Sequence, residues 1–178
     1  MSAGKLLGLL VVLVLFSTAA VAQSPNYNLI EVGLLRIDPD SSSNENGWFV
    51  GGSFQVRKKF HLFIEFAELD PAEQWQVGGG WHGLFGKRAD FVAQGAWVDT
   101  DFEDGFKASI GVRGMILRRL EINGFINYTD LDFSENNSIS VHGIWDFARR
   151  FGVGGGYEFG DEFDVLRGFV RFNLGPRQ

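Results

Sequence analysis

From Asn26 onward, apolar and polar residues alternate with a period of two, and no segment sustains a helical period. Turn-rich segments interrupt the alternation, so the sequence predicts an all-β chain of ten strands. The strands are expected at 26–37, 47–56, 60–69, 74–84, 89–98, 105–116, 120–129, 138–147, 151–159 and 165–174. Eight strands are the alternative, if a weak hairpin such as the glycine-rich segment 151–174 does not form.

Two kinds of connection alternate between these strands, one short and basic, the other longer and acidic. The basic connections are Arg57-Lys58-Lys59, Gly86-Lys87-Arg88, Leu117-Arg118-Arg119 and Ala148-Arg149-Arg150. The acidic connections are Asp38–Asn46, Asp70–Glu73, Asp99–Asp104, Asp130–Asn137 and Gly160–Asp164. This strict alternation predicts an antiparallel up-and-down barrel whose two ends carry opposite charge.

The two faces of the predicted strands differ sharply in polarity. One face carries all five Trp and most of the Ile and Phe, whereas the other carries the three His and many charged residues. A soluble barrel with the apolar face inside is the alternative, but a ten-stranded barrel has little interior room for five Trp. We therefore expect the apolar face to point outward into lipid and the strands to cross a membrane.

Aromatic residues on the apolar face collect toward both ends of the strands, as two membrane interfaces would require. The predicted strands also have about the 9–11 residues that a tilted transmembrane strand needs. The residues predicted to form this membrane girdle are Trp48, Trp75, Trp81, Trp97, Tyr128 and Trp145.

The N-terminal segment has the pattern of a cleaved signal peptide. Lys5 precedes an apolar run, and Ala20-Val21-Ala22 is a small-residue cleavage site. We expect residues 1–22 to be this signal peptide and residues 23–178 to be one outer-membrane barrel domain. The run is short for an uncleaved anchor. Export and a transmembrane barrel together predict the outer membrane of a Gram-negative bacterium, with periplasmic termini and extracellular acidic loops.

Composition narrows the chemistry further. The chain of 178 residues has no Cys, which excludes disulfides, thiolate metal sites and a Cys nucleophile. Its net charge of −6 argues against nucleic acid as a partner. We expect no cofactor, and we expect its partners to be outer-membrane lipids, lipopolysaccharide and the machinery that inserts barrels.

Three segments resemble a known kind of barrel, namely Trp75-Gln76-Val77-Gly78-Gly79-Gly80, Arg88-Ala89-Asp90-Phe91-Val92-Ala93 and Gly111-Val112-Arg113-Gly114. With them the chain resembles small outer-membrane barrels of the OmpX and OmpA transmembrane-domain type. It looks most similar to a small xanthomonad barrel family linked to diffusible-signal regulation. The resemblance spans most of residues 26–174 and implies surface exposure and no established enzymatic activity. Such barrels usually end in an aromatic residue, whereas this chain ends Leu174-Gly175-Pro176-Arg177-Gln178.

Partners on the polar face can be predicted, because antiparallel residues paired across one turn have a constant sum of residue numbers. The sums predict a lumen network in which the following residues pair in turn: Gln55 with His61, His61 with His82, His82 with Asp90, Asp90 with Arg113, Arg113 with Asn123, and, separately, Glu158 with Arg167. His142 is expected opposite Gly156. We interpret the network as a hydrogen-bonded plug, since charged groups in the lumen must be paired or hydrated.

A metal site at His61, His82 and Asp90 is the less favoured alternative, because Arg113 would compete with the cation for Asp90. No nucleophile–base pair is evident and the acidic loops lack His, so we predict no catalytic residues and no enzyme. The sequence favours a barrel with a largely plugged polar lumen and a structural or surface-interaction role. A narrow channel for small solutes or ions is the alternative.

Overall fold

A computed structural model describes residues 25–39, 44–70, 72–86 and 88–175. The predicted signal peptide, residues 1–22, lies outside this part of the chain. No helix among the described residues is long and apolar enough to span a membrane.

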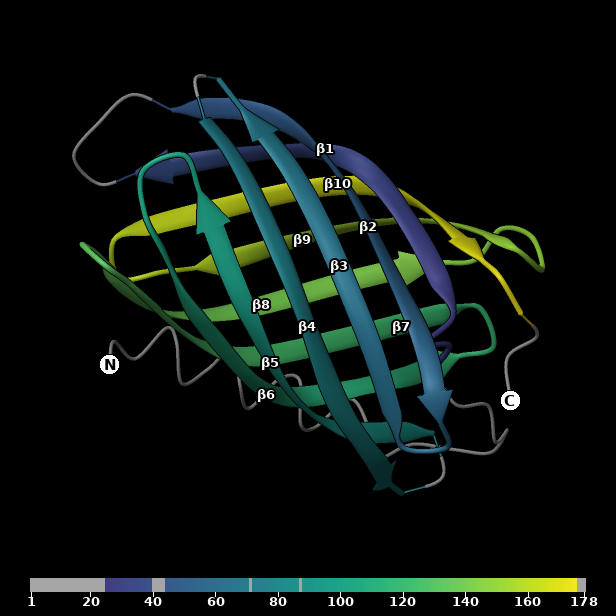
Figure 1. Cartoon of the computed structure of the whole chain (residues 1–178). Coiled ribbons are helices and arrows are strands. Elements are labelled where there is room, and N and C mark those ends of the chain that lie inside the picture. Colours follow the sequence, from purple (N-terminus) through teal and green to yellow (C-terminus); the bar gives the residue numbers. More distant parts are fainter. Residues whose placement is uncertain (1–24, 40–43, 71, 87, 176–178) are drawn as a thin grey trace.

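The described chain forms one closed barrel of ten antiparallel strands (Figure 1). The strands are β1 (Leu29–Pro39), β2 (Glu45–Arg57), β3 (Phe60–Leu69), β4 (Ala72–Phe85), β5 (Ala89–Thr100), β6 (Asp104–Leu117), β7 (Leu120–Leu131), β8 (Glu135–Trp145), β9 (Phe151–Phe159) and β10 (Phe163–Asn173). Each strand pairs with its sequence neighbours, and β1 pairs with β10. The predicted up-and-down topology is confirmed, and the eight-stranded alternative is wrong.

Strand ends differ from the prediction in a consistent direction. Most strands run further toward the acidic connections than expected, so that β5 continues to Thr100 and β8 begins at Glu135. Backbone pairing continues there because each hairpin satisfies its own N–H and C=O groups even where the side chains are polar. The acidic connections therefore shorten to segments such as 101–103 and 132–134, and the expected difference in loop length is wrong.

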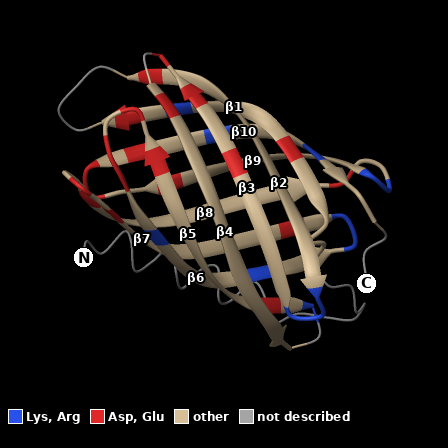
Figure 2. Cartoon of the chain, in the orientation of Figure 1, with Lys and Arg blue, Asp and Glu red and all other residues tan. Residues whose placement is uncertain are grey.

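The predicted difference in charge between the two ends is present. Figure 2 shows Asp and Glu gathered at one end of the barrel and the Lys- and Arg-containing turns at the other. We call these the acidic end and the basic end. Both described ends of the chain lie at the basic end, where Asn26 contacts Asn173.

The outer wall of the barrel is apolar and the inside is largely polar. Leu34 is 70% exposed and Phe54 is 60% exposed on the outer face. Buried side chains of the described residues include about as many polar as apolar groups. The buried apolar cluster contains Leu35, Phe49, Ala67, Leu69, Ile144 and Phe169. This arrangement is the reverse of a water-soluble barrel, which places its apolar face inside.

Backbones approach closely at Gly111 of β6. A Cβ there would collide with the carbonyl oxygen of Gly124 and would lie 2.6 Å from Phe125 Cδ1. At Gly168 of β10, by contrast, an added Cβ meets nothing within 4 Å. The two strand glycines can therefore be compared directly, because an added methyl group has no room at Gly111 and has room at Gly168.

We expect Gly111→Ala to destabilise the barrel by about 1–3 kcal/mol, because the new methyl group forces backbone shifts. Gly168→Ala should leave stability nearly unchanged. Urea titration of the refolded protein, followed by the heat-dependent shift of the folded band on gels, measures both. Equal unfolding midpoints for the two variants would contradict the close approach.

Candidate functional site

The sequence predicted a first strand from residue 26, but β1 begins at Leu29, and the segment 26–28 before it enters the lumen at the basic end. Tyr27 is only 2% exposed. Its ring stacks on His82 with the centroids 3.8 Å apart, and the ring of His61 lies 4.8 Å away. The guanidinium of Arg113 lies 4.6 Å from the centre of the same ring. Tyr27 therefore fills the lumen at this level.

Hydrogen bonds fix Tyr27 and its neighbour to the barrel wall. The Tyr27 hydroxyl donates to Asp90 Oδ2 at 3.1 Å, and Arg113 Nη2 donates to the carbonyl of Asn26 at 3.2 Å. Burial raises the pKa of the Tyr27 hydroxyl well above its usual value, Arg113 opposes this shift and Asp90 adds to it. The hydroxyl therefore stays protonated and able to donate. We call Tyr27, His61, His82, Asp90 and Arg113 the closing layer.

An ion-pair cluster crosses the lumen beside the closing layer. Glu121, fully buried, accepts from Arg113 at 2.7 Å and from Arg171 at 3.0 Å. Arg171 also contacts Glu31 at 2.7 Å. The cluster links the neighbouring strands β6 and β7 to the neighbouring strands β10 and β1, and these two pairs of strands are not next to each other in the barrel. Removing one member would leave a buried charge without its partner, and that is strongly destabilising.

Two further ion pairs lie in the lumen. Arg167 on β10 donates to both carboxylate oxygens of Glu65 on β3 at 2.9 Å. Lys107 lies 3.7 Å from Glu158, which also accepts from Ser138 and from Asn127. Glu31, Glu65, Glu121 and Glu158 are thus each paired with Arg or Lys within the barrel.

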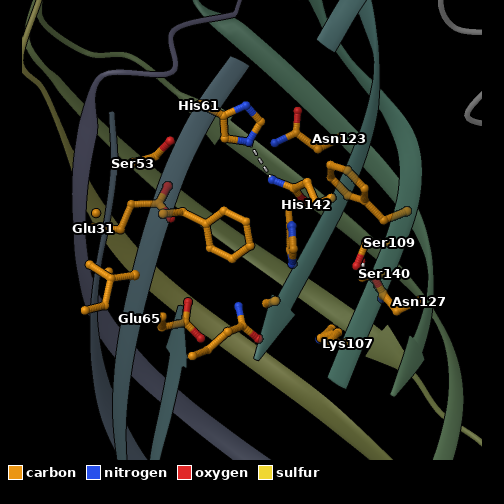
Figure 3. A pocket seen from close by; sticks show the side chains of 18 of the residues that line it. Glu31, Ser53, His61, Glu65, Lys107, Ser109, Asn123, Asn127, Ser140 and His142 are labelled. Atoms are coloured by element: carbon orange, nitrogen blue, oxygen red, sulfur yellow. Dashed lines mark hydrogen bonds between the residues drawn. The ribbon is translucent and has the colours of Figure 1, made fainter. Parts of the chain in front are cut away.

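The lumen retains open space on both sides of the closing layer. One cavity of about 210 Å³ lies in the middle of the barrel, lined mostly by polar side chains that point toward a common space (Figure 3). A second cavity of about 370 Å³ lies at the basic end, lined by Tyr27, Lys58, Lys59 and Asp90 among others. Tyr27 lines the second cavity but not the first.

The register agrees with part of the predicted lumen network. Matching pairs are Gln55 with His61, Asp90 with Arg113, Arg113 with Asn123, and His142 with Gly156. Three predicted pairs are wrong, because His61 lies opposite Gly80, His82 opposite Val92, and Glu158 opposite Val165. The turns at these hairpins are centred one residue away from the predicted position, which moves the register by two. A shift of two keeps every side chain on the same face.

The side-chain partners in the structure differ from the predicted ones more than the strand register does. Asp90 bonds to Tyr27 and lies 3.7 Å from His82, while Arg113 pairs with Glu121. Arg167, expected to pair with Glu158, reaches across the lumen to Glu65 instead. The sequence analysis placed many charged residues on the polar face without assigning partners to most of them. Glu31, Glu65, Glu121 and Arg171 are among these residues, and each has a partner in the lumen. Tyr27 was missed altogether, since its alternation with polar neighbours resembles a strand.

The structure gives no support to the metal alternative. Among the described residues, no group of three or more His, Asp or Glu is arranged to hold a metal ion. His61 Nε2 is occupied by the Gln94 amide at 2.9 Å, and Asp90 is engaged by Tyr27.

The predicted girdle residues lie on the outer face. Their exposed fractions run from 38% for Trp81 to 54% for Trp145. Trp48, Trp75, Trp97 and Tyr128 lie toward the acidic end, and Trp81 and Trp145 toward the basic end. Contact of these rings with lipid headgroups stays a prediction.

No family model matches the sequence. No curated protein matches it either. The fold, however, is similar to the KdgM porin in complex with disordered oligogalacturonate, with a TM-score of 0.57 and 8% identity over 83% of this chain and 99% of that chain.

A second KdgM porin structure gives a TM-score of 0.56 at 9% identity, covering 82% of this chain and 99% of that chain. A third structure, described as de novo design of transmembrane β-barrels, gives a TM-score of 0.50 at 9% identity. The match covers 84% of this chain and 98% of that chain. At such identities the likeness concerns the fold alone. The resemblance to the OmpX and OmpA type and to the xanthomonad family stays a prediction.

We expect Glu121→Ala to destabilise the barrel by about 3–5 kcal/mol, because two buried arginines lose their shared partner. Glu68→Ala is the control, since Glu68 is exposed near the acidic end and contacts only Trp48 in the described hydrogen bonds. Urea unfolding of both variants in detergent measures the difference. Similar midpoints would mean that the ion-pair cluster does little for stability.

Proposed function

We propose that the protein is an outer-membrane β-barrel that serves as a narrow passage for small solutes, closed in this conformation by the closing layer. An apolar exterior favours lipid as its surroundings, and a closed barrel leaves no sheet edge unpaired there. The predicted signal peptide supports export to the outer membrane. The similarity in fold to the KdgM porin is consistent with a passage role.

One observation above all supports a passage. The lumen is closed by Tyr27, which belongs to the segment before β1 and not to the barrel wall. Open space of about 210 and 370 Å³ remains on the two sides of it. Moving this short segment would join the two spaces without breaking any strand pairing.

The closing layer is also incompletely satisfied. His61 Nδ1 and His82 Nε2 are buried and have no hydrogen-bond partner among the described residues. A buried polar group without a partner costs about 1–3 kcal/mol. Water that enters when Tyr27 moves would hydrate both rings, which reduces the free-energy difference between closed and open states.

A permanently closed barrel with a structural or surface-interaction role is the second candidate, and the sequence favoured it. The ion-pair cluster of Glu121, Arg113 and Arg171 supports it, because these bonds span the lumen and Arg113 also holds the carbonyl of Asn26. We propose the passage first, because the wall leaves space that a permanent plug would fill. No catalytic role is proposed.

The membrane location predicts the behaviour of Trp fluorescence. All five Trp lie on the outer face and are at least 38% exposed. After refolding into vesicles, lipids brominated on their acyl chains should quench most of the Trp emission, whereas acrylamide in the water should quench little. A soluble barrel would show the opposite pattern.

Single-channel current in planar bilayers tests the passage. We expect Tyr27→Ala to conduct with a severalfold higher open probability than the unmodified protein, because it removes the ring that fills the lumen. Tyr27→Phe, which loses only the bond to Asp90, should be intermediate. Arg113→Ala should also raise conductance, since it removes the hydrogen bond to the Asn26 carbonyl and the cation next to the Tyr27 ring.

Tyr128→Ala is the matched control, since Tyr128 lies on the outer face at 39% exposure. If the Tyr27 and Arg113 variants fold but carry no more current than this control, the passage is wrong and the permanently closed barrel is favoured.

A further inference from the structure

We propose that the central cavity of the lumen binds a small, uncharged, polyhydroxylated solute of about the size of one sugar ring. This site deepens the proposed passage, because its occupant would lie in the path between the two ends. A role of this site in transport rests on the proposed passage, whereas the binding of the solute does not. The argument comes from the size, charge balance and hydrogen-bonding groups of the cavity.

Size sets the first limit. The cavity has a volume of about 210 Å³. This space is large enough for several water molecules or for one compact solute. A single small unit is therefore the occupant that we propose.

Charge sets the second limit. Each charged group on the cavity wall already has a partner of opposite sign within the lumen: Glu65 with Arg167, Glu158 with Lys107, Glu31 and Glu121 with Arg171, and Glu121 with Arg113. A charged solute would have to break one of these pairs or remain unpaired itself, and both are costly in a buried site. The wall therefore disfavours anions and cations alike.

Neutral polar groups remain available for hydrogen bonding. Ser53 Oγ and Asn123 Oδ1 are buried without a partner among the described residues, and both residues line the cavity. Figure 3 shows Ser53, His61 and Asn123 around the same end of the pocket. A serine hydroxyl donates and accepts, whereas an amide oxygen only accepts. A solute hydroxyl meets both needs because it donates and accepts without carrying charge.

Aromatic side chains contribute the remaining selectivity. Phe63 and Phe125 line the same cavity as the polar groups. Their apolar faces offer packing area to the C–H groups of a ring-shaped polyol, which a purely polar solute such as urea lacks. A combination of neutral hydrogen-bonding groups and ring faces suits a sugar or a cyclic polyol better than an ion.

The test compares three probes of one ring size on the protein folded in detergent. D-glucose is uncharged, D-glucuronate is an anion and D-glucosamine is a cation at neutral pH. Isothermal titration should show D-glucose binding and at least about tenfold weaker binding of both charged rings, since each would disrupt an ion pair. Equal or tighter binding of a charged ring, or no binding of D-glucose by the folded barrel, would overturn the proposal.

Variants locate the site. Asn123→Ala should weaken D-glucose binding by roughly five- to tenfold, as expected for one lost hydrogen bond. Asn136→Ala is the control, because Asn136 is a buried Asn outside the cavity that contacts the 160–162 connection. Heat-dependent gel migration checks that both variants are folded. An equal loss in the two variants would place binding elsewhere and overturn the site.

The outcomes separate this proposal from the passage. Binding of D-glucose with no current in any Tyr27 or Arg113 variant would keep the site and remove the passage. Current without selective binding would keep the passage and remove the site.

Discussion

The pairing of β1 with β10 is the contact on which the rest of the structure depends. It runs over the whole length of β1, from Leu29 opposite Asn173 to Pro39 opposite Phe163. Without this ladder the sheet would have two open edges, whose unpaired N–H and C=O groups would be costly in lipid. With it, the polar faces of all the strands enclose one lumen, and charged residues from distant strands come within bonding distance.

Enclosure explains how so much charge is tolerated. Glu121, Arg113, Arg171 and Glu31 come from four strands and satisfy one another only because the barrel brings opposite walls together. The exterior offers no such partners, so charged residues on that face are restricted to the strand ends and turns. The same geometry leaves unpaired neutral groups beside a cavity, and this contrast between paired charges and free hydrogen-bonding groups underlies both proposals.

The basic end differs from the acidic end in a way that bears on function. At the basic end the chain before β1 turns inward, and Tyr27 packs among His61, His82 and Arg113. Tyr27 lies outside the strand ladder, so its movement would break hydrogen bonds of the segment 26–28 but no pairing between strands. The closing layer therefore joins the barrel wall to a short segment outside the strands. That segment is held by the hydrogen bonds of the Asn26 and Asn28 carbonyls and of the Tyr27 hydroxyl.

The alternation of apolar and polar residues by itself determined the ten strands, their order and the face that each side chain takes, because a period of two relates sequence directly to the faces of a sheet. Gln55, His61, Asp90 and Arg113 were therefore placed on the polar face correctly. Only the tertiary structure decided the partners across the lumen, such as Arg167 with Glu65, and the inward turn of Tyr27. Pairing sums relate neighbouring strands alone, whereas these contacts depend on the curvature that brings opposite walls of the closed barrel together.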